Sequence, residues 1–144
     1  MKKTDSEDED DNELFIFSLL ILNEERYLKL RIYNIAKSQH WYNNILSTYG
    51  DVRFKKVLRM LLENFKSLVN LIKNHSIFQS NDPKQQAPVK LQLAVFLRKL
   101  GLRNDIFSIC FNYGISEGTV ILFCKCVIKA IISFKTCYIK WPTG

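Results

Sequence analysis

The chain has 144 residues, of which 47% are hydrophobic and 24% are charged, and its formal net charge is +7. This length fits one domain with a tail and argues against a two-domain enzyme, because folding units usually run to roughly 100–150 residues. The hydrophobic content excludes disorder along the whole chain.

Charge is divided unevenly along the sequence. Residues 5–13 hold 7 of the 14 acidic residues, whereas from residue 14 onward 19 Lys and Arg stand against 7 Asp and Glu. This basic excess indicates a polyanionic partner, nucleic acid first and an anionic membrane second. A basic surface that serves only solubility is the plainer alternative.

The N-terminal part of the chain has an acidic segment followed by an apolar run. Residues 1–13 are predicted to be a disordered acidic tail, and residues 14–80 an N-terminal helical region. The apolar run at residues 14–22 predicts a short helix or strand, since a membrane-spanning helix needs ~20 residues. An acidic block rather than a basic segment stands directly before this run, and no small-residue cleavage site follows it, so a signal peptide fits poorly. The chain therefore reads as intracellular, with its four cysteines as reduced thiols.

Residues 24–49 have an irregular pattern that assigns no element. From residue 53 to 73, apolar residues recur at helical spacing, and a helix running straight through from Arg53 is predicted. Its opposite face carries six cations and one acid: Arg53, Lys55, Lys56, Arg59, Glu63, Lys66 and Lys73. A solvated face is the default interpretation of such a stripe, and phosphate contact is the alternative.

The second half of the chain begins after a linker. Residues 80–88 read SNDPKQQAP, a run of turn formers and helix breakers. A helix is predicted over residues 90–100, with Gly101 at the position where it would end. No segment with strand periodicity follows residue 50, so the fold class is predicted to be mostly α, a small helical domain containing a helix-turn-helix.

Residues 106–125, IFSICFNYGISEGTVILFCK, have the layout of this helix-turn-helix. Gly114 would supply the positive φ of the turn, and Ser116 would cap the second helix. Small Cys110 would lie where the two helices approach closely. The DNA-binding region is predicted to span residues 89–140. Helix pairs joined by a glycine turn also occur in helical proteins that bind no DNA, and this reading stays open. The inward-facing residues are predicted to be Ile106, Ile109, Cys110, Ile115, Val120, Phe123 and Cys124.

If the motif reads DNA, the N-terminal half of its second helix enters the major groove. That placement predicts that Ser116 to Thr119, Ile121, Leu122 and Lys125 face the groove. Glu117 also has a plainer role, because an acid at the N-terminus of a helix is favourable without a ligand. The DNA-binding residues are predicted to be Arg103, Asn104, Lys125 and Lys129 at phosphates, and Ser116, Glu117, Thr119 and Leu122 at bases.

From about residue 26 to the end, the chain resembles the N-terminal region of PIF/Harbinger-type DDE transposases, in the form found in fungal genomes. The resemblance rests on residues 41–46 (WYNNIL), 53–56 (RFKK), 59–60 (RM), 78–79 (FQ), 91–97 (LQLAVFL), 116–120 (SEGTV) and 141–142 (WP). In such proteins this region is similar to a helix-turn-helix DNA-binding module that precedes an RNase H-like catalytic domain. The resemblance implies binding to double-stranded DNA in the nucleus.

Two departures from the family pattern shape the expected function. The catalytic domain of the family begins shortly after the Trp-Pro pair, so its metal-binding carboxylates are not in this sequence, and a truncated, non-enzymatic module is expected. Leu61 and Leu62 stand where the family commonly has a small polar helix cap, which suggests that the helix here runs straight through from Arg53. A helical protein-interaction module, which binds a Myb-like accessory protein or a second copy, is the alternative function. An inactive transposon fragment is the third.

No cofactor, metal or small-molecule substrate is expected, and no membrane partner. Cys110, Cys124, Cys126 and Cys137 match no zinc-binding spacing and are expected to be buried as small apolar side chains. Trp41 and Trp141 are expected to be core or interface anchors rather than base-stacking platforms. Because the second helix is apolar on two sides, its stripe of Ile121, Ile128 and Ile132 is predicted to need a cover from self-association or a partner. The apolar segment at residues 14–22 is the alternative cover.

Overall fold

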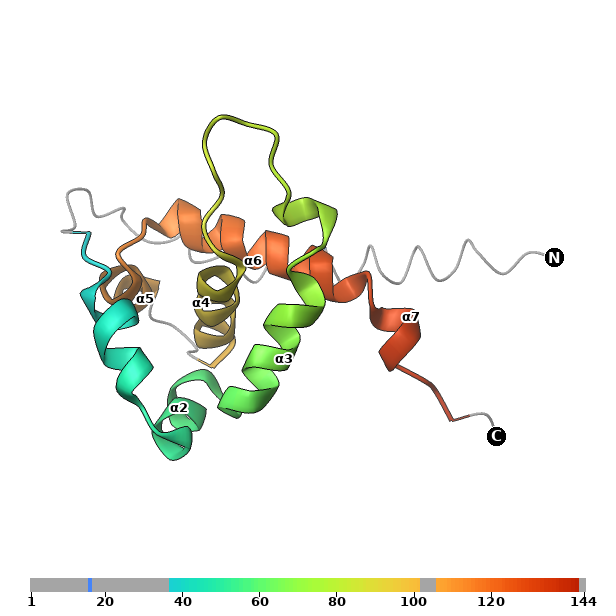
Figure 1. Ribbon diagram of the computed structural model, residues 1–144, viewed down its shortest axis with the longest axis horizontal. Helices are drawn as coiled ribbons and strands as arrows, with labels where there is room; N and C mark the ends of the chain where they lie inside the picture. Colours follow the sequence, from blue (N-terminus) through green and yellow to red (C-terminus); the bar gives the residue numbers. More distant parts are fainter. Residues whose placement is uncertain (1–15, 17–36, 102–105, 143–144) are drawn as a thin grey trace.

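Helices make up all the regular secondary structure of the part of the chain that the computed structural model describes, residues 16, 37–101 and 106–142 (Figure 1). The prediction of a mostly α-helical domain is confirmed. The predicted acidic tail, and residues 14–36 apart from residue 16, lie outside the described residues.

Helix α4, Val89–Gly101, lies at the centre of the fold. It contacts α2, α3, α5 and α6, and its buried residues occur on several sides of the helix. A helix enclosed in this way is apolar nearly all round, which explains the LQLAV run in its first half. Its end at Gly101 agrees with the predicted end. Residues 79–88 form no helix before it, in agreement with the linker predicted over residues 80–88.

The prediction of one long helix over residues 53–73 is wrong. The chain forms α2, Asp51–Leu58, and α3, Leu62–Ile72, separated at Arg59, which has a left-handed φ of 58°. On a straight helix, Phe54 and Phe65 would be ~16 Å apart along the axis. The break instead brings their rings to a centroid distance of 5.4 Å, edge to face. Both short helices then pack on α4, which one straight helix could not do along its length. Leu61, at the start of α3, is 44% exposed.

The segment before α2 packs against α5, Ile106–Tyr113. A π-helical turn, η1 (Trp41–Ile45), continues into a 3-10 turn, η2 (Leu46–Thr48). The rings of Trp41 and Tyr42 lie 5.5 and 5.7 Å from the ring of Tyr113 in α5. Tyr113 is fully buried, and burial raises the pKa of its hydroxyl well above the ordinary value. One core therefore joins the predicted N-terminal region and the helix-turn-helix region.

The remaining short elements lie at the ends of α3 and α6. The 3-10 turn η3 (Ser76–Phe78) follows α3, and His75 Nδ1 accepts a hydrogen bond from the Ile77 backbone N–H at 3.1 Å. Helix α7, Lys135–Tyr138, follows α6 and leads to Trp141, which is 80% exposed. Trp41 packs against the core as expected, whereas Trp141 lies outside the core, which leaves only the interface role expected for it.

Candidate nucleic-acid interface

The helix-turn-helix consists of α5, Ile106–Tyr113, and α6, Glu117–Ile132, joined by Gly114, Ile115 and Ser116. Gly114 has a φ of 63°, as its predicted role in the turn requires. The Ile115 backbone N–H donates to the Cys110 carbonyl at 3.2 Å, the longer-range bond of a Schellman motif. Ile115 and Cys110 are both buried, so the turn is closed by packing as well as by hydrogen bonding.

Ser116 caps α6 as predicted. Its Oγ accepts a hydrogen bond from the Thr119 backbone N–H at 3.3 Å, and it lies 2.9 Å from the Thr119 Oγ1. A cap of this kind satisfies one of the free N–H groups at the start of a helix and contributes ~1 kcal/mol. The two hydroxyls predicted to contact bases thus bond to each other. Each keeps lone pairs toward the solvent, since Ser116 is exposed and Thr119 half-buried.

Four residues on one side of α6 form what we call the outer stripe: Gly118, Leu122, Lys125 and Lys129. Their spacing of four, three and four places them one helical turn apart. Leu122 is 57% exposed, Gly118 and Lys129 are exposed, and Lys125 is half-buried. The opposite side packs into the core through Val120, Phe123, Cys124 and Val127, so α6 presents a single continuous outward face.

The structure corrects one residue of the predicted groove-facing set. Ile121 is only 3% exposed and cannot contact a base. Ile128 is also buried, whereas Ile132 is half-buried. Two of the three residues of the second apolar stripe are therefore closed to a second molecule. The alternative cover, the segment at residues 14–22, lies outside the described residues apart from residue 16.

The other predicted site residues divide into two groups. Glu117 lies half-buried in the first turn of α6, where a carboxylate favours the positive end of the helix dipole. Arg103 and Asn104 lie outside the described residues. The motif therefore brings together Ser116, Thr119 and the outer stripe.

A feature that sequence reasoning missed lies on α5. Phe107 and Phe111, one turn apart, are 46% and 60% exposed. The signal was present in the sequence, because Phe107 and Phe111 directly follow Ile106 and Cys110, two of the positions predicted to face inward. Exposed aromatic pairs beside an interface are typical contacts for a ligand or a partner.

The cysteines divide by burial. Cys110 and Cys124 are buried as expected, Cys126 is half-buried, and Cys137 is exposed, so the expectation of burial is wrong for Cys137. Burial raises the pKa of the Cys124 thiol to about 12, with a smaller opposing effect from the Lys99 charge. Burial also raises the pKa of Cys126, and the nearby charge of Lys129 lowers it. Within the described ranges, no group of three or more His, Cys, Asp or Glu could hold a metal ion.

The described helices include none long and apolar enough to cross a membrane. No protein-family model matches the sequence, and neither a curated protein nor a solved structure matches it.

Proposed function

We propose that this chain is a non-catalytic module that binds double-stranded DNA through α5 and α6, and that it derives from the N-terminal part of a Harbinger-type transposase. The observation that carries the proposal is the outer stripe of α6. It follows a capped turn, it faces solvent, and it combines a glycine, an apolar side chain and two lysines one turn apart. A major groove about 12 Å wide admits a helix with such a face.

The residues of the outer stripe would have different tasks. Lys125 and Lys129 would neutralise phosphates, which fixes position without reading sequence. Leu122 would lie against a thymine methyl group or another apolar base edge. Gly118 lies in an open position, since a Cβ built there would meet no protein atom within 4 Å. Because glycine leaves this space empty, the DNA backbone would be able to approach the start of α6. The free N–H groups of that first turn favour a nearby phosphate.

The test is a titration with random-sequence duplex DNA at two salt concentrations. Lys125→Ala and Lys129→Ala should each lower the slope of log affinity against log salt by about 1, with equal effect on all sequences. Leu122→Ala should weaken binding without changing the slope. Lys84→Ala, in the exposed 79–88 linker, is the charge-matched control. Slopes that do not differ from the control in either α6 lysine variant would reject the interface.

A second candidate function, a protein-interaction module, is favoured by a separate surface. An apolar groove of about 370 Å³ lies between the second half of α3, the end of α6 and α7. Its lining side chains are apolar except for Lys135: Leu68, Leu71, Ile72, Ile131, Ile132, Phe134, Tyr138 and Ile139. An apolar groove of this kind fits the amphipathic helix of a partner or of a second copy. Sedimentation across protein concentrations would detect self-association, and Ile139→Ser should abolish it.

A further inference from the structure

The basic side chains of α2 and of the turn after it form a surface separate from α6. We call Arg53, Lys55, Lys56 and Arg59 the α2 basic cluster. All four are exposed, and the only acid in this segment is Asp51. Among the described residues, none of the four has an ion-pair partner or a side-chain hydrogen bond. Four like charges close together on α2 and the turn after it repel one another, so the fold alone gives little reason for the cluster.

The helix dipole explains only part of this charge. Lys55 and Lys56 lie in the last turn of α2, where cations are favourable. Arg53 lies in the first turn, where a cation is unfavourable. The distribution therefore fits attraction to an external anion better than stabilisation of α2.

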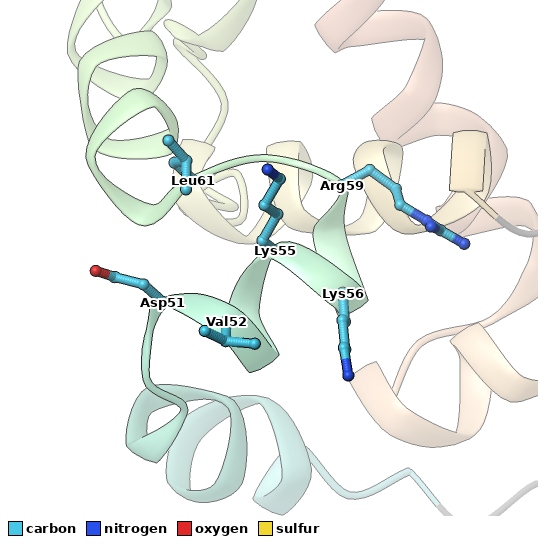
Figure 2. A pocket seen from close by; sticks show the side chains of 6 residues that line it. All are labelled: Asp51, Val52, Lys55, Lys56, Arg59 and Leu61. Atoms are coloured by element: carbon cyan, nitrogen blue, oxygen red, sulfur yellow. The ribbon is translucent and has the colours of Figure 1, made fainter.

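The cluster borders a hollow in the surface. The hollow has a volume of about 550 Å³ and is lined by Asp51, Val52, Lys55, Lys56, Arg59 and Leu61. Figure 2 shows that Lys55, Lys56 and Arg59 point in different directions from its rim, with Asp51 on the side away from Arg59. Cations that diverge in this way do not converge on one small anion. They fit an anion whose charges are spread along a chain, as the phosphates of a nucleic acid are.

Arg59 carries the most specific observation. It ends α2 in the left-handed conformation, with its backbone N–H donating to the Lys55 carbonyl at 2.8 Å. This position favours glycine, because a Cβ is strained at positive φ. The Arg59 side chain passes over the end of α4, where a Cβ built at Gly101 would lie 3.3 Å from Arg59 Cγ. The backbone conformation therefore does not explain why an arginine occupies this position. An exposed guanidinium beside the hollow, available to an anion, does explain it.

We propose that the α2 basic cluster is a second DNA-contacting surface, which binds the phosphate backbone of double-stranded DNA through Lys55, Lys56 and Arg59. The choice of DNA as the polyanion rests on the proposed function, and the cluster itself does not depend on α6. A phosphate contact is made by charge and carries no sequence information. The cluster would therefore add affinity and salt dependence without adding specificity.

The test uses the full chain, duplex DNA and four variants measured together. Lys55→Ala/Lys56→Ala should lower the salt slope by about 2 and Arg59→Gly by about 1, each by the same amount on every sequence. Lys84→Ala is the matched control, and Lys125→Ala reports on α6. Arg59→Gly should unfold at the same or a higher urea concentration than the parent, because glycine relieves the strained turn. A lower midpoint in Arg59→Gly would assign Arg59 to the fold and overturn its role as a contact.

The outcomes separate this proposal from the proposed function. A changed slope in the α2 variants with an unchanged slope in Lys125→Ala would support the α2 cluster and reject Lys125 as a phosphate contact of α6. The reverse result would reject the α2 cluster and leave α6 in place. Absence of duplex binding by the parent chain would reject both.

Discussion

Replacing Gly114 by valine should destabilise the whole domain, because the turn between α5 and α6 leaves no room for a side chain. At its φ of 63°, a residue with a Cβ is disfavoured by roughly 1–2 kcal/mol, and a β-branched residue by more. A Cβ would also lie 2.8 Å from the carbonyl carbon of Ser38 and 2.9 Å from its oxygen. These are backbone atoms, so the segment before η1 would have to move, at a typical cost of 1–3 kcal/mol.

The two effects together amount to about 2–5 kcal/mol, against a total stability of roughly 5–15 kcal/mol for a domain of this kind. Urea unfolding followed by circular dichroism should therefore show a much lower midpoint, and DNA binding should be lost together with folded protein. Gly50→Ala is the control, since a Cβ there meets no atom within 4 Å and φ is −67°. If Gly114→Val unfolds at the same urea concentration as the parent, the turn is not built as described here.

Three further outcomes are expected. Gly118→Ala should stabilise the folded protein by about 0.5–1 kcal/mol, because alanine favours helix. The same change should weaken DNA binding if the DNA backbone approaches the start of α6. Unfolding and binding measured on one preparation separate the two effects. Burial raises the pKa of Cys124 to about 12 from an ordinary value near 9. Between these two pH values the native state therefore binds more protons than the unfolded state. Stability should therefore be unaffected below about pH 8.5 and fall as pH rises, by about 2 kcal/mol near pH 10.5, and Cys124→Ala should reduce this fall in urea titrations. A disulfide reagent should label Cys137 rapidly and Cys126 slowly in the folded protein, and Cys137→Ser should remove the rapid phase.

The helix-turn-helix could be predicted from sequence because its signals are local. Gly114 at the turn, Ser116 as the cap and buried residues at one-turn spacing each specify the backbone near them. The same holds for α4, whose end at Gly101 follows from the residue type. The predictions that the structure confirms concern elements whose backbone conformation is determined by residues a few positions apart in the sequence.

The break between α2 and α3 could not be predicted, because its cause is not local. The apolar spacing continues in phase across Arg59, and neither glycine nor proline marks the turn. Packing of Phe54 against Phe65, and of both helices on α4, selects the break. Tertiary contacts override helix periodicity here. The η1 and η2 turns depend in the same way on Tyr113, far along the chain.

The outward face of α6 was predicted for Leu122 and Lys129 and wrongly predicted for Ile121. Periodicity identifies one buried side of a helix, but it does not show when a second side is buried as well. Ile121 is 3% exposed because α6 is enclosed on two sides, which the sequence alone showed only as a second apolar stripe. The exposed aromatic pair on α5 could not be assigned a role from sequence, because helical periodicity identifies the inward positions and says nothing of what the outer ones contact.

The most direct test of the central claim, that the outer stripe of α6 is the DNA-contacting surface, is to follow backbone amide signals by NMR during titration with duplex DNA. The largest shifts are expected from Ser116 to Lys129 and in α5, together with smaller changes at α2. Saturable binding with shifts confined to the apolar groove at α3 and α7, or a chain that binds no duplex at low salt, would contradict it.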